Sequence, residues 1–325
     1  MTTRLTMPKR IISSIAGAAT IALSLWGTPT LAGDMFRTSN TRNIGNNTEA
    51  AFKAIFKEGN YREGKRYLQQ AESTEANEPL VYALQASFAY TDNDWNAVNG
   101  YASKTLQAAG RLNRSDPLRS KLYTGVGNFL QGAYTYKQQG AVGALTKLQQ
   151  VFQNLDDAEK ISPRDPEFNL IQGYMNLMLA ANLPFSNPNQ AIEQLAKYAG
   201  PRYLADRGIA IGYRDLKQYD KALEYVNRAV QQTPNNPEVH YLKAQIRVEQ
   251  GKKQKNSSFF NQAKQEFQTA LSSSEQLPKV LVGQIFYEQC QNQNRLDNKN
   301  RECNALKNQI KNKGGTWGPA ELPRL

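Results

Sequence analysis

The stretch Tyr203–Asn236, YLADRGIAIGYRDLKQYDKALEYVNRAVQQTPNN, decides the fold. Its two halves each carry apolar residues at helical spacing, and a polar turn near Lys217 and Gln218 separates them. Pro234 cannot continue a helix and marks the end of the unit. The stretch therefore predicts two antiparallel helices that share an apolar seam, formed by Ile209, Ala210, Tyr213 and Leu216 in the first and Ala222, Val226, Ala229 and Val230 in the second.

The start of a unit has a pattern that recurs along the chain. It consists of a proline, an apolar residue five positions later and a small residue seven positions after the proline. Asp116, Asp165 and Asn236 directly precede three of these prolines, and Asp or Asn followed by Pro is a strong local helix-start signal. The recurrences are Pro79-Leu84-Ala86, Pro117-Leu122-Thr124, Pro166-Ile171-Gly173 and Pro237-Leu242-Ala244. With a first unit near Gly45 and a last one at Pro278, the predicted unit starts are 45, 79, 117, 166, 203, 237 and 278.

The unit resembles the tetratricopeptide repeat family, whose small, aromatic and proline positions are occupied by Ala210, Tyr213, Tyr219, Ala222, Ala229 and Pro234. Asp206 departs from the pattern, because the family places an aromatic residue there. The resemblance implies an all-α, right-handed superhelical solenoid of about seven antiparallel hairpins over residues 45–313. As a whole, the chain looks like exported cyanobacterial-type repeat proteins of unknown function.

The first 32 residues have the three parts of a secretory signal peptide. Arg4, Lys9 and Arg10 form a basic start, an apolar run follows from Ile11 to Trp26, and small residues lead to Ala32. The run is short for a membrane span, which needs about 20 residues. We therefore expect export to the periplasm or another extracytoplasmic space, with an uncleaved membrane anchor as the alternative. No later segment is apolar enough to span a membrane.

Three segments fall outside the helical pattern. Residues 33–44 are expected to be a flexible N-terminal segment, and residues 314–325, rich in Gly and Pro, an extended tail. Unit spacings longer than 34 residues place insertions between several hairpins. The run Gly251–Asn261 is polar and rich in Lys, Gln, Asn and Ser, which predicts a flexible loop.

The chain has two cysteines, Cys290 and Cys303, on the two helices of the last predicted hairpin. In an oxidising compartment a disulfide between them is expected, and it would stabilise the exposed end of the solenoid. In a reducing compartment the same residues would stay as thiols. Without a nearby histidine they do not form a four-ligand zinc site.

The sequence offers little for catalysis. The single histidine, His240, is expected to pack between helices, since it has no nucleophile or ligand partner at a useful spacing. We interpret the carboxylates of Asp156, Asp157 and Glu159 as part of a solvent-exposed helix face. No phosphate-binding loop, nucleophile elbow or metal motif is present. We expect no enzyme activity, no cofactor and no metal.

The net charge of the chain indicates which classes of partner are expected. The net charge of +12 falls by three, to +9, without residues 1–32. The basic residues are scattered and form no stripe of the kind that binds nucleic acid, so nucleic acid is not expected as a partner. An acidic partner is favoured by the overall charge.

The resemblance places partner contacts on the concave face, at set positions of each first helix. The clamp of family members that grip a C-terminal peptide is absent, because Ile211 and Gly125 stand where it needs Asn. The predicted function is an exported, non-catalytic interaction or assembly module, and the alternative is an envelope enzyme or a factor that binds glycan or peptidoglycan. Oligomeric state stays open. By register, the expected protein- or peptide-binding groove consists of Lys121, Asn128, Tyr174, Arg207, Arg214, Tyr241 and Gln245.

Overall fold

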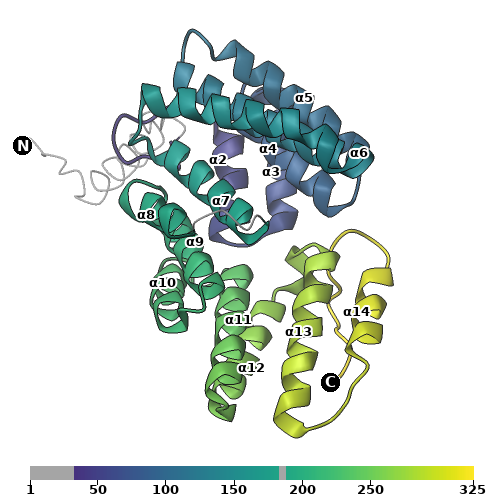
Figure 1. Cartoon of the computed structure of the whole chain (residues 1–325). Coiled ribbons are helices and arrows are strands. Elements are labelled where there is room, and N and C mark those ends of the chain that lie inside the picture. The colour runs from purple at the N-terminus through teal and green to yellow at the C-terminus, as the bar shows by residue number, and fades with distance from the viewer. Residues whose placement is uncertain (1–32, 183–187) are drawn as a thin grey trace, which may run out of the picture.

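The computed structural model describes residues 33–182 and 188–325. Within them, the regular elements are helices, which follow one another as antiparallel pairs (Figure 1). The expected all-α helical solenoid is confirmed. The expected signal peptide, residues 1–32, lies outside the described residues.

Seven hairpins make up the described part of the chain. Their first helices begin within one residue of the predicted unit starts. The pairs are α2 (Asn46–Phe52), continued by η1 (Lys53–Lys57), with α3 (Tyr61–Thr74); α4 (Pro79–Thr91) with α5 (Trp95–Arg111); the two arms of α6 (Pro117–Ile161); α7 (Pro166–Asn182) with α8 (Pro188–Lys197); α9 (Arg202–Asp215) with α10 (Tyr219–Gln232); α11 (Pro237–Gln254) with α12 (Ser257–Leu271); and α13 (Lys279–Asp297) with α14 (Cys303–Asn312). The short η2 (Ser274–Gln276) joins the last two pairs.

The helix starts follow from local chemistry. The carboxylate of Asp116 accepts the backbone N–H of Arg119 at 3.1 Å, and that of Asp165 accepts the N–H of Phe168 at 3.0 Å. The side chain of Asn236 accepts the N–H of Glu238 at 2.9 Å. Each cap satisfies an amide that has no partner within the helix, and the proline that follows has no N–H to satisfy.

The third hairpin is formed by α6 alone, which breaks at Gly140 (φ 76°, ψ −167°). The two arms then run antiparallel, so that Gly125 lies against Leu155. Gly127 faces α5, where a Cβ atom would approach Leu106 to 2.7 Å. Glycine is therefore needed at Gly127 for close packing of the two helices.

The polar run Gly251–Asn261 is not a flexible loop, so that prediction is wrong. Helix α11 continues to Gln254, Lys255 turns in the left-handed region (φ 53°), and Asn256 caps α12. Gly251 lies against the ring of Phe260, where a Cβ atom would approach to 2.7 Å. The apolar contact between the two helices sets the structure here, and the polar side chains lie on the outer faces.

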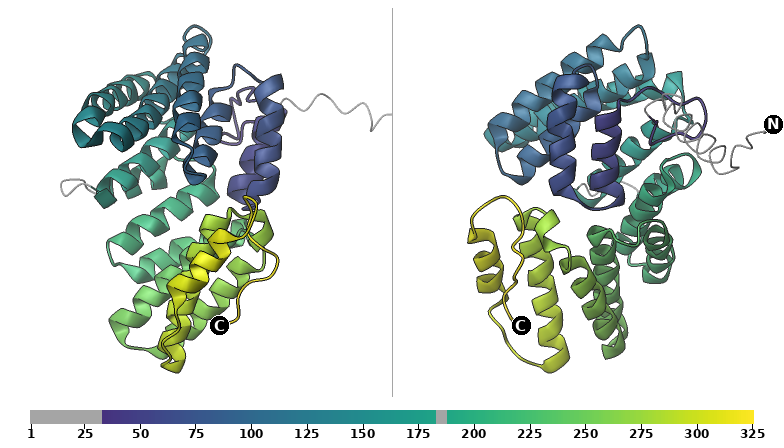
Figure 2. Two further views of the ribbon diagram at one scale, coloured as in Figure 1. Left: turned by 90° about the vertical axis from the view of Figure 1, so that its right-hand side faces the viewer. Right: turned by 180° about the vertical axis from the view of Figure 1, so that it is seen from behind.

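The superhelix returns to its own N-terminal hairpin. The amide of Asn236 donates to the carbonyl oxygen of Phe56 at 2.9 Å, and the Tyr61 hydroxyl donates to Glu238. The cation of Arg62 lies 5.9 Å from the centre of the Trp317 ring. Both views in Figure 2 show α2 and α3 directly above the C-terminal helices. Hairpins far apart in sequence thus enclose the concave face from two sides.

Both ends of the described chain are packed. Residues 33–44 contain no helix, and Phe36 and Ile44 in this segment are buried. The expected flexibility of the segment stays a prediction. In the extended tail, Gly318 donates its N–H to Leu277 O at 2.8 Å, and Thr316 O accepts from Lys279 N at 3.0 Å. The tail therefore lies along the start of α13.

Candidate functional site

The inner side of the solenoid contains an apolar cavity of ≈ 470 Å³. Its wall comes from the N-terminal segment, from the first hairpin and from α4, α6, α7, α9 and α11. Most lining side chains are aliphatic or aromatic, including Phe36, Phe52, Phe56, Leu84, Phe129, Ile171 and Met175.

One end of this apolar cavity is polar. Arg207 and Tyr61 both donate to the carboxylate of Glu238, which joins α9, α3 and α11. Burial opposes the charge of Arg207, but Glu238 holds the pKa of this guanidinium above its usual value. Beside it, the Tyr174 hydroxyl donates to Leu204 O at 2.8 Å, and burial raises the pKa of Tyr174 to about 12. Each of these polar side chains therefore has a hydrogen-bond partner within the protein.

A second hollow, the polar groove, has a volume of ≈ 580 Å³ and lies across α9, α11 and α13. Hydrogen bonds cross it: Arg214 Nη1 donates to Gln245 Oε1 at 2.8 Å, and Gln245 Nε2 donates to Glu288 Oε2 at 3.0 Å. The Tyr241 hydroxyl donates to Glu288 Oε1 at 2.7 Å. The residues that line the groove are Arg214, Asp215, Lys217, Tyr219, Gln245, Val248, Glu249, Lys252, Phe267, Tyr287, Glu288, Gln291 and Arg295.

The seven predicted groove residues fall into three places. Arg214, Tyr241 and Gln245 share the hydrogen-bonded row of the polar groove, whereas Tyr174 and Arg207 line the apolar cavity.

The remaining two lie between the arms of α6. Lys121 Nζ pairs with Asp157 at 3.1 Å, and Asn128 accepts from Lys147 Nζ at 3.5 Å. They line neither hollow, because the second arm of α6 folds back over that side of the first arm.

The isolated histidine has polar partners. Its Nδ1 lies 2.7 Å from Glu266 Oε2, and its Nε2 lies 2.8 Å from Pro234 O. His240 therefore links α11 to α12 and to the preceding turn. No group of His, Cys, Asp and Glu side chains in residues 33–182 and 188–325 is suited to hold a metal ion.

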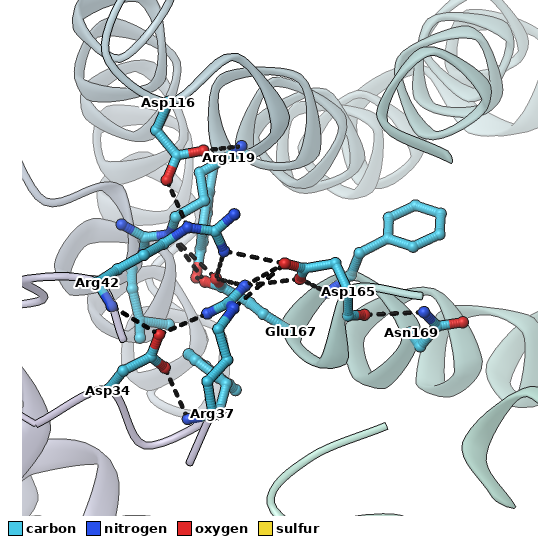
Figure 3. A network of polar contacts seen from close by, with 12 residues as sticks. Asp34, Arg37, Arg42, Asp116, Arg119, Asp165, Glu167 and Asn169 are labelled. Atoms are coloured by element: carbon cyan, nitrogen blue, oxygen red, sulfur yellow. Dashed lines mark hydrogen bonds and ion pairs between the residues drawn. The ribbon is translucent and has the colours of Figure 1, made fainter. Parts of the chain in front are cut away.

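Sequence reasoning missed a buried network of charges at the N-terminal end (Figure 3). Arg119 donates to Glu78 at 2.7 and 2.9 Å and to Glu167 at 3.1 Å. Arg37 Nη2 binds both oxygens of Asp165, at 2.6 and 2.5 Å. Burial raises the pKa of Glu78, although Arg119 opposes this shift. The network combines the carboxylates of Asp34, Glu78, Asp116, Asp165 and Glu167 with the guanidinium groups of Arg37, Arg42 and Arg119.

One sequence signal could have indicated this network. Glu78, Asp116 and Asp165 each stand directly before the recurrent proline that starts a first helix. First helices of successive hairpins lie side by side in a solenoid, so their N-cap positions line up along one edge. Three carboxylates on one buried edge require cations nearby. Arg119 supplies the cation for Glu78, whereas Arg37 and Arg42 supply those for Asp165 and Asp116 from the N-terminal segment, which no periodicity links to that edge.

The two cysteines form a disulfide, with Cα atoms 5.7 Å apart. It connects Cys290, within α13, to Cys303, the first residue of α14. Among the described residues, no helix has both the length and the apolar character to cross a bilayer.

Comparison with known proteins identifies one repeat. Residues 204–246 match the family model of the tetratricopeptide repeat, which confirms the family resemblance at that unit. No curated protein matches the chain. The likeness to exported cyanobacterial-type proteins stays a prediction.

Solved structures with similar folds include PilW, described as a widely conserved type IV pilus biogenesis factor. It is 14% identical, with a TM-score of 0.46, over 72% of this chain and 94% of that chain. The human IFIT1 dimer with m7Gppp-AAAA is 14% identical, with a TM-score of 0.42, over 91% of this chain and 65% of that chain. These values carry no inference about what this protein binds.

Proposed function

We propose that the protein is an exported, non-catalytic interaction module that binds an acidic protein segment in the polar groove. The observation that carries this proposal is the hydrogen-bonded row of Arg214, Gln245, Glu288 and Tyr241. Arg214, Gln245 and Glu288 of this row line an open hollow on the inner face of three consecutive first helices, and Tyr241 is hydrogen-bonded to Glu288. A tetratricopeptide repeat contributes α9 and α10 to this region.

The groove is lined by basic, acidic and aromatic side chains. Four cationic side chains and three carboxylates line it, and Arg214 and Lys252 are paired with Asp215 and Glu249. Lys217 and Arg295 are exposed and form no ion pair among the described residues. Tyr287 also lines the groove, and Tyr and Arg are among the residue types that contribute most to interface energies.

One of the three carboxylates, Glu288, belongs to the hydrogen-bonded row. Glu288 accepts hydrogen bonds from Tyr241, Gln245 and Gln284, so its lone pairs are largely occupied. An acidic segment would meet the free cations of the groove. Such electrostatic complementarity mainly speeds association and sets specificity.

The test is affinity capture from envelope extract with the purified protein, followed by binding measurements on the captured partner. The double variant Arg214→Glu, Arg295→Glu should bind at least about tenfold more weakly. The matched control, Lys160→Glu with Lys299→Glu, changes the charge equally at exposed positions outside the groove and should bind normally. Equal affinity of both variants would remove the groove assignment. Capture of glycan or peptidoglycan without protein would favour the alternative, a glycan-binding factor.

A further inference from the structure

The third hairpin is longer than its neighbours and extends past the start of α5. Its unit, residues 117–165, has 49 residues, whereas the regular unit, residues 203–236, has 34. The first arm of α6 runs along α5 and reaches the first residue of that helix at Lys137, whose Nζ lies 5.8 Å from the centre of the Trp95 ring. In the described stretch 131–150, which we call the α6 tip, no side chain is buried. The additional length of α6 therefore does not serve the packing of the solenoid.

The α6 tip presents large apolar side chains to solvent. Val142 is 82% exposed, Tyr136 62% and Leu145 57%. They lie within ten residues on both sides of Gly140, whose positive φ of 76° reverses the chain. Single exposed apolar residues are common on protein surfaces, whereas a group of them on one projecting turn is typical of an interaction site.

Two aromatic side chains of the α4–α5 turn lie beside this tip. Tyr90, near the end of α4, is 58% exposed, and the centre of its ring lies 5.3 Å from that of Trp95. The contact of Lys137 with Trp95 joins this pair to α6. Tyr and Trp concentrate where lipid headgroups meet acyl chains, because their rings are apolar and their edges polar.

The charge of the α6 tip is positive. Lys137 and Lys147 are its two cationic residues, and residues 131–150 contain no Asp or Glu. Neither lysine forms an ion pair within the described part of the chain. The carboxylates of the adjacent α4–α5 turn have their own partners, since Asp92 pairs with Lys65 at 3.3 Å and Asp94 caps α5. The apolar side chains are thus accompanied by cations that remain available to anionic groups.

We propose that the α6 tip docks on an anionic lipid surface. Val142 and Leu145 enter the acyl region, and Tyr136 and Lys137 stay at the level of the headgroups. A projecting convex turn fits a fluid lipid layer, which can close around it, and the long stem of a lysine lets its ammonium group reach a phosphate from an apolar surrounding. The insertion is shallow, as in proteins that bind to the membrane surface. This surface goes beyond the proposed function and shares no residue with the polar groove.

The first measurement uses an environment-sensitive fluorophore on the α6 tip of the full chain. Ala141→Cys supplies the labelling site, because the two native cysteines are joined in a disulfide. Vesicles of phosphatidylglycerol and phosphatidylcholine should shift the emission to shorter wavelength, and vesicles of phosphatidylcholine alone should shift it less. The same label at Lys299→Cys, on the exposed turn between α13 and α14, is the matched control and should not shift.

Two results would overturn the proposal. In the first, the protein sediments with the vesicles while the emission of the tip label stays unchanged, which would mean that another segment binds the lipid. In the second, the emission shifts without vesicles as the protein concentration rises, which would mean that a second copy of the chain covers the tip.

The second measurement is the vesicle partition constant of variants that carry the same tip label. Val142→Ser with Leu145→Ser should bind about tenfold more weakly, because two apolar side chains no longer enter the lipid. Ile161→Ser with Val280→Ser removes two other exposed apolar side chains and should bind as the unaltered protein does. Circular dichroism confirms that each variant is folded. Equal partition of these two folded double variants would contradict insertion of the tip.

The anionic character of the lipid is tested separately. Lys137→Gln should bind about fivefold more weakly at low salt, since each lysine near an anionic surface contributes about 1 kcal/mol. High salt should abolish this difference by screening. Lys299→Gln changes the charge equally on the α13–α14 turn and should bind normally. A Lys137→Gln variant that binds anionic vesicles as tightly as Lys299→Gln at low salt would rule out the electrostatic part of the proposal.

Discussion

The first four hairpins and the last three use one repeat geometry but are held together by different chemistry. In the N-terminal region, a buried network centred on Arg119 and Glu167 ties the N-terminal segment to the N-caps of successive helices, around an apolar cavity. In the C-terminal region, a disulfide fixes the last hairpin, and a polar groove stays open. The N-terminal network includes pairs 128 and 130 residues apart in sequence, whereas the C-terminal disulfide joins residues 13 apart.

This difference assigns separate roles to the two regions. Buried charges lose much solvation free energy, and they are retained in a protein only when each has partners in good geometry. We infer that the N-terminal network fixes the curvature that brings the first hairpin back to α11. The polar groove is then held at a defined position relative to the first hairpin. Four predictions test how far the regions are independent.

The largest effect is expected from Arg119→Leu. This change removes the cation that binds Glu78 and Glu167 and leaves two buried carboxylates without their main partner. Breaking a buried pair in this way costs about 3–5 kcal/mol of unfolding free energy. Chemical denaturation measures the loss. Arg228→Leu, which breaks an exposed pair with Glu224, should change stability by less than about 1 kcal/mol. Similar small losses in both variants would mean that the network does not stabilise the N-terminal region.

Removal of the disulfide should have the next largest effect. Replacing Cys290 and Cys303 by alanine opens a loop with a sequence separation of 13. The chain-entropy model gives a loss of about 3 kcal/mol for a loop of this size. Hydrogen exchange should show the loss in α13 and α14, with α4 and α6 protected as before. Loss of protection throughout the chain would contradict the separation of the two regions.

Local signals in the sequence were sufficient for the starts of several first helices. Asp116-Pro117 and Asn236-Pro237 define helix starts within two residues, so those boundaries could be predicted without any tertiary contact. The run Gly251–Asn261 was misjudged because its polar composition concealed the packing of Phe260 on Gly251. Composition describes the outer face of a helix pair, whereas the contact between the helices decides its structure.

The site was harder to predict because it depends on superhelix geometry. Arg214, Tyr241 and Gln245 could be identified by register, since they lie on adjacent first helices in regular units. Lys121 could not be placed, because the turn at Gly140 folds an arm back onto it. Two partners of Arg37, Asp165 and Glu167, lie 128 and 130 residues away, and no periodic pattern connects them to it.

A smaller effect is expected where the two regions meet. Asn236→Ala removes both the cap of α11 and the hydrogen bond to Phe56 O that closes the superhelix. Asn256→Ala removes only a cap, that of α12, which costs about 1 kcal/mol. Denaturation should show an additional loss of about 1 kcal/mol for Asn236→Ala, since its second hydrogen bond is also lost. Equal losses would mean that the contact with the first hairpin adds no stability.

The smallest expected effect is a pH dependence of the unfolding free energy that comes from His240 in the C-terminal region. The hydrogen bond with Glu266 raises the pKa of His240 above its usual value, although burial opposes this shift. Because the folded-state pKa is raised, the stabilisation is fully present below the unfolded pKa and is lost as the pH rises through the folded pKa. The imidazole is partly exposed, so we expect less than about 1 kcal/mol. His240→Gln should therefore lower the unfolding free energy more at pH about 5.5 than at pH about 8.5. In a Glu266→Gln background this pH-dependent difference should disappear, because the group that stabilises the imidazolium ion is absent. If the difference persists there, the charge of His240 is stabilised by another group.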